Sequence, residues 1–158
     1  MNGDSYNKGK VNESLSWRVV RKRGLVRPTN EQRKNIVDVF ASIGKPIGKS
    51  GFDLIESTYY DAALDKTTLL GVINKITLFE LKTAGLKRKS KVGDDWKGLG
   101  FTLTNSEKVN AELLGEQYKF VFLNLKNDKM NVYDIGDFFK PEISNIYPTF
   151  SVFIKGVE

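Results

Sequence analysis

Two oppositely charged side chains stand two residues apart inside an apolar segment, at Glu80 and Lys82. The surrounding residues, 75–82, are rich in the apolar and β-branched types that form buried strands. Side chains alternate along a strand, so the carboxylate and the ammonium are expected on the same face, a few ångströms apart. Charged groups in a buried strand are costly unless they pair, bind a metal or face a cleft. The pattern therefore indicates a functional pair.

The absence of histidine and cysteine limits the chemistry that this pair can join. It excludes serine–histidine and cysteine–histidine catalysis, structural zinc sites and thiol redox chemistry. The remaining metal ligands are oxygen atoms, which suit hard cations, Mg²⁺ first and Mn²⁺ or Ca²⁺ after it. Carboxylates, a lysine and a hard metal ion are together the components of phosphodiester hydrolysis.

A further acid, Asp53, lies in a short predicted strand, residues 52–55, that follows a turn over residues 48–51. It is the expected partner of Glu80. Under a different strand register another acid could replace it as a metal ligand: Glu56, which is nearest, or Asp61 or Asp65. The structural alternatives are that Asp53 caps the entry to its strand and that Glu80 and Lys82 form an ion pair at a sheet edge.

The elements around these residues follow from caps and apolar patterns. Capping boxes at Thr29 and Thr104 predict two helices, the second of which ends at Gly115. The predicted strands cover residues 52–55, 67–73, 75–82, 118–125 and 131–135, with a β-prone tail at 148–154, and the second and third are expected to pair antiparallel through Asn74. This order predicts an α/β (α+β) fold with a central mixed β-sheet flanked by helices. We expect a flexible polar and basic arm over residues 1–15 and a single domain over residues 16–158.

The acids and the lysine resemble the motif of a known nuclease superfamily. An Asp on one strand, here Asp53, followed on a neighbouring strand by Glu-x-Lys, here Glu80-Leu-Lys82, is similar to the PD-(D/E)xK nucleases, the fold of many restriction endonucleases. A Glu on an N-terminal helix, here Glu31, often accompanies the motif, whereas the Pro that names the superfamily is replaced by Phe52. More narrowly, the chain resembles a domain of unknown function that accompanies bacterial restriction and helicase proteins, over residues 51–53, 80–83, 100–107 and 118–122.

This resemblance implies a restriction endonuclease-like core and a Mg²⁺-dependent endonuclease that hydrolyses DNA phosphodiester bonds. Asp53 and Glu80 would hold the Mg²⁺, for which Mn²⁺ could substitute. Lys82 would orient the attacking water or stabilise developing negative charge, and Glu31 would orient Lys82 or reach a metal through water. A restriction or defence enzyme of this kind is expected to act on double-stranded DNA as a homodimer, so that two sites cut two strands.

The net charge of +6 lies almost entirely in residues 1–28, and a second basic cluster, residues 87–91, follows the strand that carries Glu80 and Lys82. Such clusters are typical of proteins that contact phosphate backbones, although a solvated surface is the alternative interpretation. We expect them to bind nucleic acid: Arg21, Lys22 and Arg23 in the first cluster, and Lys87, Arg88, Lys89 and Lys91 in the second.

Two other functions remain open from the sequence. One is a catalytically inactive nuclease-fold module that binds DNA for a partner enzyme. The other is a basic protein-interaction or ribosome-associated domain in which Glu80 and Lys82 are structural. Because the chain has neither a long apolar run nor an apolar core near its N-terminus, we expect a cytoplasmic protein with no membrane partner.

Overall fold

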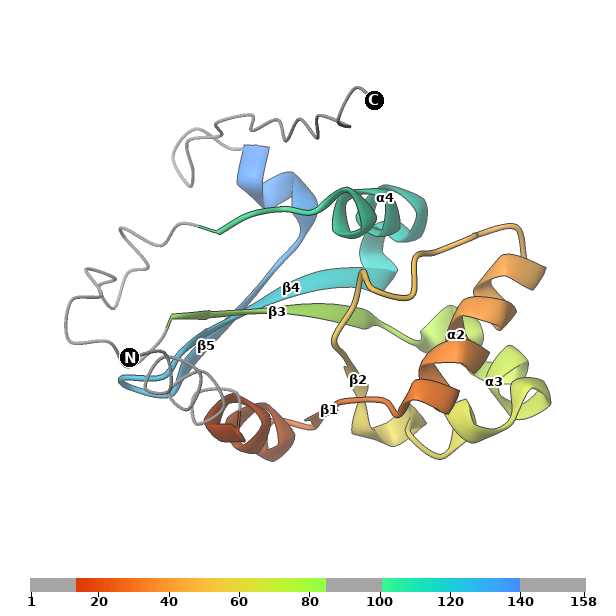
Figure 1. The fold of residues 1–158 in the computed structure, drawn as a ribbon, viewed down its shortest axis with the longest axis horizontal. Coiled ribbons are helices and arrows are strands. Elements are labelled where there is room, and N and C mark those ends of the chain that lie inside the picture. Colours follow the sequence, from red (N-terminus) through yellow and green to blue (C-terminus); the bar gives the residue numbers. More distant parts are fainter. Residues whose placement is uncertain (1–13, 85–100, 140–158) are drawn as a thin grey trace, which may run out of the picture.

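The computed structural model describes residues 14–84 and 101–139, which Figure 1 traces from a red N-terminal helix to the blue last strand and turn. In chain order the helices and strands are a helix over residues 14–22, β1 (Leu25–Val26), α2 (Asn30–Ser42), β2 (Leu54–Glu56), α3 (Lys66–Val72), β3 (Leu78–Ala84), α4 (Asn105–Leu114), β4 (Tyr118–Asn124) and β5 (Lys129–Tyr133). Short 3₁₀ turns cover Ser57–Tyr59, Ala62–Leu64, Ile73–Lys75, Gly115–Gln117 and Ile135–Phe139.

The strands form one mixed five-stranded sheet in the order β1-β2-β3-β4-β5. The pairs β1/β2, β2/β3 and β4/β5 are antiparallel, whereas β3 and β4 are parallel along the full length of β3. Parallel neighbours need a crossover connection, and α4 lies within it. The central strand β3 therefore contacts the strand that follows Asp53 on one side and the strand that follows α4 on the other. This arrangement confirms the predicted mixed sheet flanked by helices.

Both predicted capping boxes are present. At the start of α2, the Thr29 hydroxyl accepts from the Gln32 backbone N–H (3.2 Å), and the Gln32 amide oxygen accepts from the Thr29 N–H (2.8 Å). Thr104 and Glu107 make the same two bonds at the start of α4, at 3.3 and 3.0 Å. Gly115 ends α4 with φ at 55°, a conformation that favours glycine. The two boxes fix the first turns from which side chains reach the centre of the molecule.

The predicted strand over residues 67–73 is wrong, because this segment forms α3. The Asp65 carboxylate caps the helix by accepting from the Thr68 backbone N–H (2.7 Å). Leu69 and Ile73, four residues apart, are buried, whereas Leu70 between them is 49% exposed. That spacing places one helical face in the core and outweighs the β-branched composition of the segment.

The predicted antiparallel pairing through Asn74 is wrong as well. A 3₁₀ turn, Ile73–Lys75, follows α3 directly, and β3 begins only at Leu78. β3 pairs instead with β2, with Leu54 opposite Phe79. Glu80 consequently lies next to the segment that carries Asp53.

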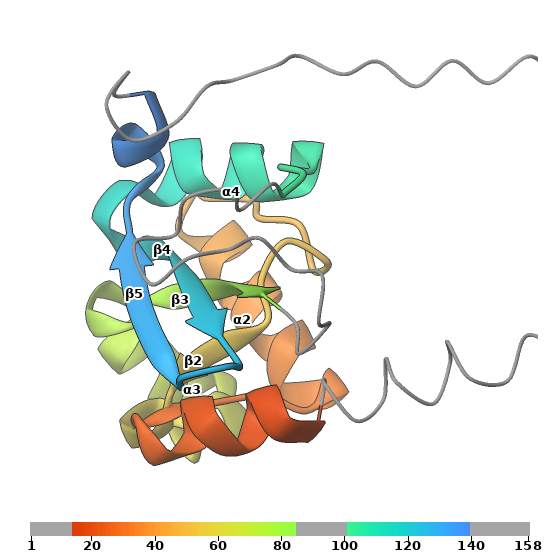
Figure 2. The ribbon, with the colours of Figure 1, turned by 90° about the vertical axis from the view of Figure 1, so that its left-hand side faces the viewer.

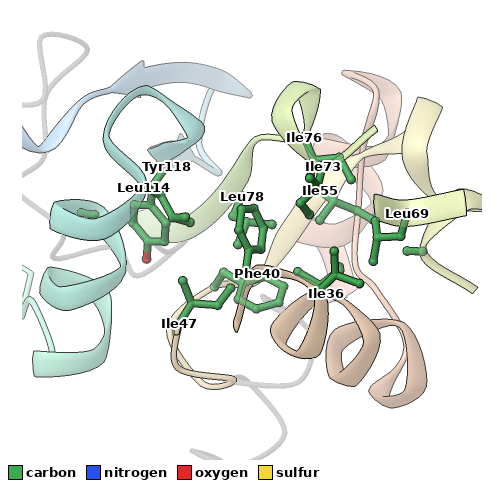
Figure 3. Packing of buried hydrophobic residues seen from close by; sticks show 14 of the residues in the cluster. Ile36, Phe40, Ile47, Ile55, Leu69, Ile73, Ile76, Leu78, Leu114 and Tyr118 are labelled. Atoms are coloured by element: carbon green, nitrogen blue, oxygen red, sulfur yellow. The ribbon is translucent and has the colours of Figure 1, made fainter. Parts of the chain in front are cut away.

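Apolar side chains on the two faces of the sheet pack against different helices. Leu78 and Phe120 join a core cluster with Ile36 of α2, and Figure 3 shows the side chains of α2 directed toward those of the sheet. On the other face, Phe79 and Val121 pack with Val20 of the N-terminal helix. Figure 2 accordingly shows that helix and α4 on opposite sides of the sheet. Because side chains alternate along β3, Glu80 and Lys82 share the face of Leu78.

Three predicted segments lie outside the described residues: most of the N-terminal arm, the loop that contains the second basic cluster, and the β-prone tail. Residues 14 and 15, at the end of the expected arm, belong to the N-terminal helix. In the two ranges that the structure describes, no helix has the length and apolar character needed to cross a bilayer.

Candidate active site

Asp53 lies directly before β2 and is bonded to β3 on both sides of Glu80. Its backbone N–H donates to the Phe79 carbonyl oxygen (2.7 Å), and its carboxylate Oδ2 accepts from the Leu81 N–H (3.2 Å). Phe79 and Leu81 flank Glu80, so these bonds bring the two acids together. The proximity of Asp53 and Glu80 predicted from the sequence is therefore present.

Lys82 lies between two carboxylates. Its Nζ is 3.0 Å from Glu80 Oε1 and 2.9 Å from Glu107 Oε1. The first contact confirms the pairing predicted from the period of a strand. The side chains of Lys82, Glu80 and Glu107 are only 14%, 10% and 6% exposed, so the ammonium depends on these acceptors in place of water. We refer to Asp53, Glu80, Lys82 and Glu107 as the acid–lysine cluster.

Burial and a neighbouring acid make Glu80 unusually weak as an acid. Desolvation raises the pKa of the Glu80 carboxyl to about 8, and the negative charge of Asp53 acts in the same direction. Lys82 opposes this shift without cancelling it. In the protein without ligands, Glu80 is therefore mostly protonated near neutral pH.

Lys82 and Glu107 are shifted toward their charged forms instead. Burial favours the neutral amine, but the hydrogen bond to Glu107 and the charge of Glu80 raise the pKa of Lys82 above its ordinary value. Burial also opposes ionisation of Glu107, yet hydrogen bonds from Lys82 and from the Thr104 backbone N–H lower the pKa of that carboxyl. The charged pair at neutral pH is thus Lys82 with Glu107, and Glu80 is a neutral third member.

α4 also fixes the turn that leads into Asp53. The Asn110 side chain accepts from the Gly48 N–H (2.8 Å) and donates to the carbonyl oxygens of Gly48 and Gly51, both at 3.1 Å. A Cβ at Gly51 would contact the Asn110 amide and lie 2.9 Å from the Ser106 carbonyl oxygen, so this close approach requires glycine. Tyr118 of β4 donates a further hydrogen bond to the Gly51 carbonyl. One helix therefore supports both the lysine and the approach to the first acid.

Comparison with known proteins does not assign the chain to a family. No protein-family model matches the chain, and neither the curated proteins nor the solved structures give a significant match. The function therefore has to be argued from the residues themselves.

The adjacent carboxylates of Asp53 and Glu80 suit a hard divalent cation. A bound cation would offset the like-charge contact that helps to raise the pKa of Glu80. Within the part of the chain that the structure describes, no group of three or more acidic side chains could hold a metal ion. Mg²⁺ sites, however, often use only one or two carboxylates and fill the other positions with water and phosphate oxygens. The pair thus fits Mg²⁺, or Mn²⁺ in its place, in this two-carboxylate mode.

The other acids considered from the sequence lie apart from the acid–lysine cluster. Glu31 is exposed in the first turn of α2, and over residues 14–84 and 101–139 no hydrogen bond or ion pair links it to the cluster. Glu56 accepts from the Thr77 N–H (3.0 Å) at the end of β2 remote from Asp53. Asp65 caps α3, and Asp61 is exposed in the turn before it.

The structure does not bring the first basic cluster to these acids. Arg21 and Lys22 are exposed at the end of the N-terminal helix, and Arg23 follows in a turn, where its guanidinium donates to the Asp128 carbonyl oxygen (3.3 Å). That helix covers the sheet face opposite Lys82. The second cluster, which contains Lys87, Arg88, Lys89 and Lys91, lies outside the described residues.

Glu107 is the member of the cluster that the sequence analysis did not identify as a site residue. Its place in the capping box of α4 was predicted, and that role is real, because Glu107 Oε2 accepts from the Thr104 N–H. The second carboxylate oxygen bonds Lys82 at the same time. The sequence signal for Glu107 is an acid at the third position of the helix that follows the Glu80 strand. Only tertiary packing, however, places that first helical turn against β3.

Proposed function

We propose that the protein is a Mg²⁺-dependent endonuclease that hydrolyses phosphodiester bonds of double-stranded DNA, with Mn²⁺ as a possible substitute metal. The observation that carries this proposal is the convergence of Asp53, Glu80 and Lys82 where the start of β2 meets the middle of β3. Two adjacent carboxylates and a buried ammonium are the groups needed to hold a hard cation and to stabilise negative charge on a phosphate.

The arrangement of the elements supports a restriction endonuclease-like core. A strand that follows the first acid pairs antiparallel with the strand that carries the second acid and the lysine, and a helix then crosses to a parallel neighbour. We propose that this unit, β2-β3-α4-β4, is the catalytic core of a restriction or defence enzyme that cuts both strands as a homodimer.

Each side chain has a definite role in this mechanism. Mg²⁺ at Asp53 and Glu80 would polarise the scissile phosphate and lower the pKa of a coordinated water. Glu80 would lose its proton on joining the metal site, and Glu107 would keep Lys82 in place when Glu80 turns to the cation. The Lys82 ammonium, little exposed to water, would stabilise the negative charge that develops on the phosphate.

A nuclease-fold module that binds DNA without cutting it is the second candidate. It is favoured by the ion pairing of Lys82, whose charge Glu107 already balances and whose ammonium also bonds Glu80, and by the lack of a three-acid group in the described ranges. Such a module would bind DNA in a salt-sensitive manner and give no metal-dependent product.

The deciding experiment is a cleavage assay on plasmid and phage DNA with and without Mg²⁺. The wild type is compared with Lys82→Ala, with Lys82→Met, which keeps most of the side-chain volume, and with Lys75→Ala as a control. Lys75 is exposed in the 3₁₀ turn before β3, so its replacement by alanine removes the same charge at a position away from the cluster. Urea titration of each variant shows whether it is folded.

We expect Mg²⁺-dependent cutting by the wild type and the Lys75 variant and none by the two Lys82 variants. Undiminished cleavage by folded Lys82→Met would overturn the nuclease assignment. Salt-sensitive DNA binding by every protein, with no cutting by any, would establish the second candidate instead.

A further inference from the structure

Helix α2 directs a cation, Arg33, toward the segment that carries the first acid of the site. The sequence analysis expected this helix to contribute Glu31, which is exposed in its first turn. Arg33, two residues further along, is only partly exposed, and its guanidinium reaches the turn and the extended residues that lead into β2. The side chain that α2 contributes to this region is therefore a cation and not a carboxylate.

The Arg33 guanidinium contacts the backbone before β2 at three carbonyl groups. Its Nη1 donates to the Lys49 carbonyl oxygen (3.2 Å) and to that of Phe52, and its Nη2 lies 3.5 Å from the Asp53 carbonyl oxygen. The guanidinium also lies 4.7 Å from the centre of the Phe52 ring, which is buried. A planar group with several fixed donors suits such contacts, which a lysine ammonium cannot reproduce. Arg33 thus ties α2 to residues 49–53.

Strand β3 holds Asp53 from the other side. The Asp53 N–H donates to the Phe79 carbonyl oxygen (2.7 Å), and the Asp53 carboxylate accepts from the Leu81 N–H (3.2 Å). Asp53 therefore lies between a guanidinium from α2 and the strand that carries Glu80. Loss of the contacts on the α2 side would allow the Asp53 carboxylate to move relative to that of Glu80.

The guanidinium contacts the backbone of Asp53 and not its carboxylate. Burial lowers the pKa of the Arg33 guanidinium, and the charges of Asp53 and Glu80 oppose this effect. Over residues 14–84 and 101–139, however, no ion pair joins Arg33 to either acid. Arg33 can thus fix the position of the Asp53 carboxylate while leaving that group able to bind a metal ion.

We propose that Arg33 is a positioning residue for the metal site: it clamps the backbone before β2 so that the Asp53 carboxylate stays at β3 beside Glu80. The inference rests on the proposed function and adds to it the residue that sets the geometry of the two carboxylates. By its charge alone, a cation near a metal site weakens metal binding. The clamp predicts the opposite sign, namely that loss of Arg33 weakens the binding of a divalent cation.

The test compares four proteins. They are the wild type, Arg33→Met, which removes the charge and the hydrogen bonds, Arg33→Lys, which retains the charge and loses the planar fork, and Lys34→Met. The last is the control, since Lys34 is an exposed cation at the next position of α2. Urea titration shows which variants are folded, and Arg33→Lys supplies the test if Arg33→Met does not fold.

The first measurement needs no metal. Hydrogen exchange of the Leu81 amide, followed by NMR in EDTA, reports whether the Asp53 carboxylate stays in place, because that amide donates to it. We expect exchange at Leu81 to be at least about tenfold faster in the Arg33 variants when it is compared with the amides of β4, and unchanged in Lys34→Met. Wild-type exchange at Leu81 in a folded Arg33 variant would overturn the proposal.

The second measurement is a titration with Mn²⁺, in which the EPR signal of the free ion gives the affinity. We expect the affinity to fall by about 10- to 100-fold in both Arg33 variants and to keep the wild-type value in Lys34→Met. Unchanged or tighter binding by a folded Arg33 variant would also overturn the proposal. If none of the proteins binds Mn²⁺, the metal site of the proposed function is refuted, whereas the exchange at Leu81 still decides whether Arg33 holds Asp53.

Discussion

At the scale of single residues, Lys82 is held by a carboxylate from a helix as well as by one from its own strand. Glu107 is the charged partner of Lys82 near neutral pH, because Glu80 retains its proton. An ammonium that is 14% exposed cannot exchange this partner for bulk water at little cost. The position of the lysine at the site therefore depends on Glu107.

We expect Glu107→Gln to lower the rate of Mg²⁺-dependent DNA cleavage by about 10- to 100-fold, because Lys82 loses the charge that fixes it. Glutamine keeps an oxygen that can accept from the Thr104 N–H, so α4 should retain its cap. The measurement is the initial rate of loss of supercoiled plasmid. Glu112→Gln, an exposed acid on the same helix, is the matched control, and equal rates in the two variants would contradict the role of Glu107.

Sequence reasoning could predict the Glu80–Lys82 contact but not the whole cluster. The contact follows from the period of a strand, which is a local property. Glu107 joins the cluster because of the direction in which α4 crosses between β3 and β4. No local sequence pattern determines that direction.

At the scale of elements, α4 supports the site because one of its faces is polar and buried. Asn110 is fully buried and makes three hydrogen bonds with the backbone of the turn before Asp53. Gly51 permits this contact by lacking a side chain. The first acid of the site thus depends on the same helix as the lysine.

We expect Asn110→Ala to lower the free energy of unfolding by roughly 1–3 kcal/mol, because it removes three hydrogen bonds and leaves the Gly48 N–H without its acceptor. Urea denaturation measures the change. The control is Asn105→Ala at the exposed first residue of α4, which should stay within about 0.5 kcal/mol of the wild type. A loss as small for Asn110→Ala as for the control would show that this clamp contributes little.

The elements that could be predicted are those with local start and stop signals. The boxes at Thr29 and Thr104 and the glycine at position 115 defined α2 and α4 correctly. Residues 67–73 have the composition of a strand, whereas the cap at Asp65 and the spacing of Leu69 and Ile73 favour the helix that forms. Strand order could not be derived, since it depends on which segments meet in the core.

At the scale of the whole molecule, the lack of histidine leaves a wide pH range with few titrating groups. The lowered pKa values of Asp38, Asp65 and Glu107 contribute stability that is present above their ordinary values and is lost only in acid. The raised pKa of Lys82 affects the free energy of unfolding only in alkaline solution. Between about pH 5 and 8, Glu80 is therefore the described side chain whose titration differs most between the folded and the unfolded protein.

Glu80 binds its proton more tightly in the folded protein, with a pKa of about 8 against 4.5 for the ordinary group, so deprotonation favours unfolding throughout this range. We expect the free energy of unfolding, measured by urea titration in EDTA, to fall by roughly one kcal/mol per pH unit from pH 5 toward 8. Glu80→Gln, which keeps the shape of the protonated side chain and cannot ionise, should remove most of this slope. Parallel pH profiles for the wild type and the variant would mean that the desolvated carboxyl of Glu80 does not govern the pH dependence of stability.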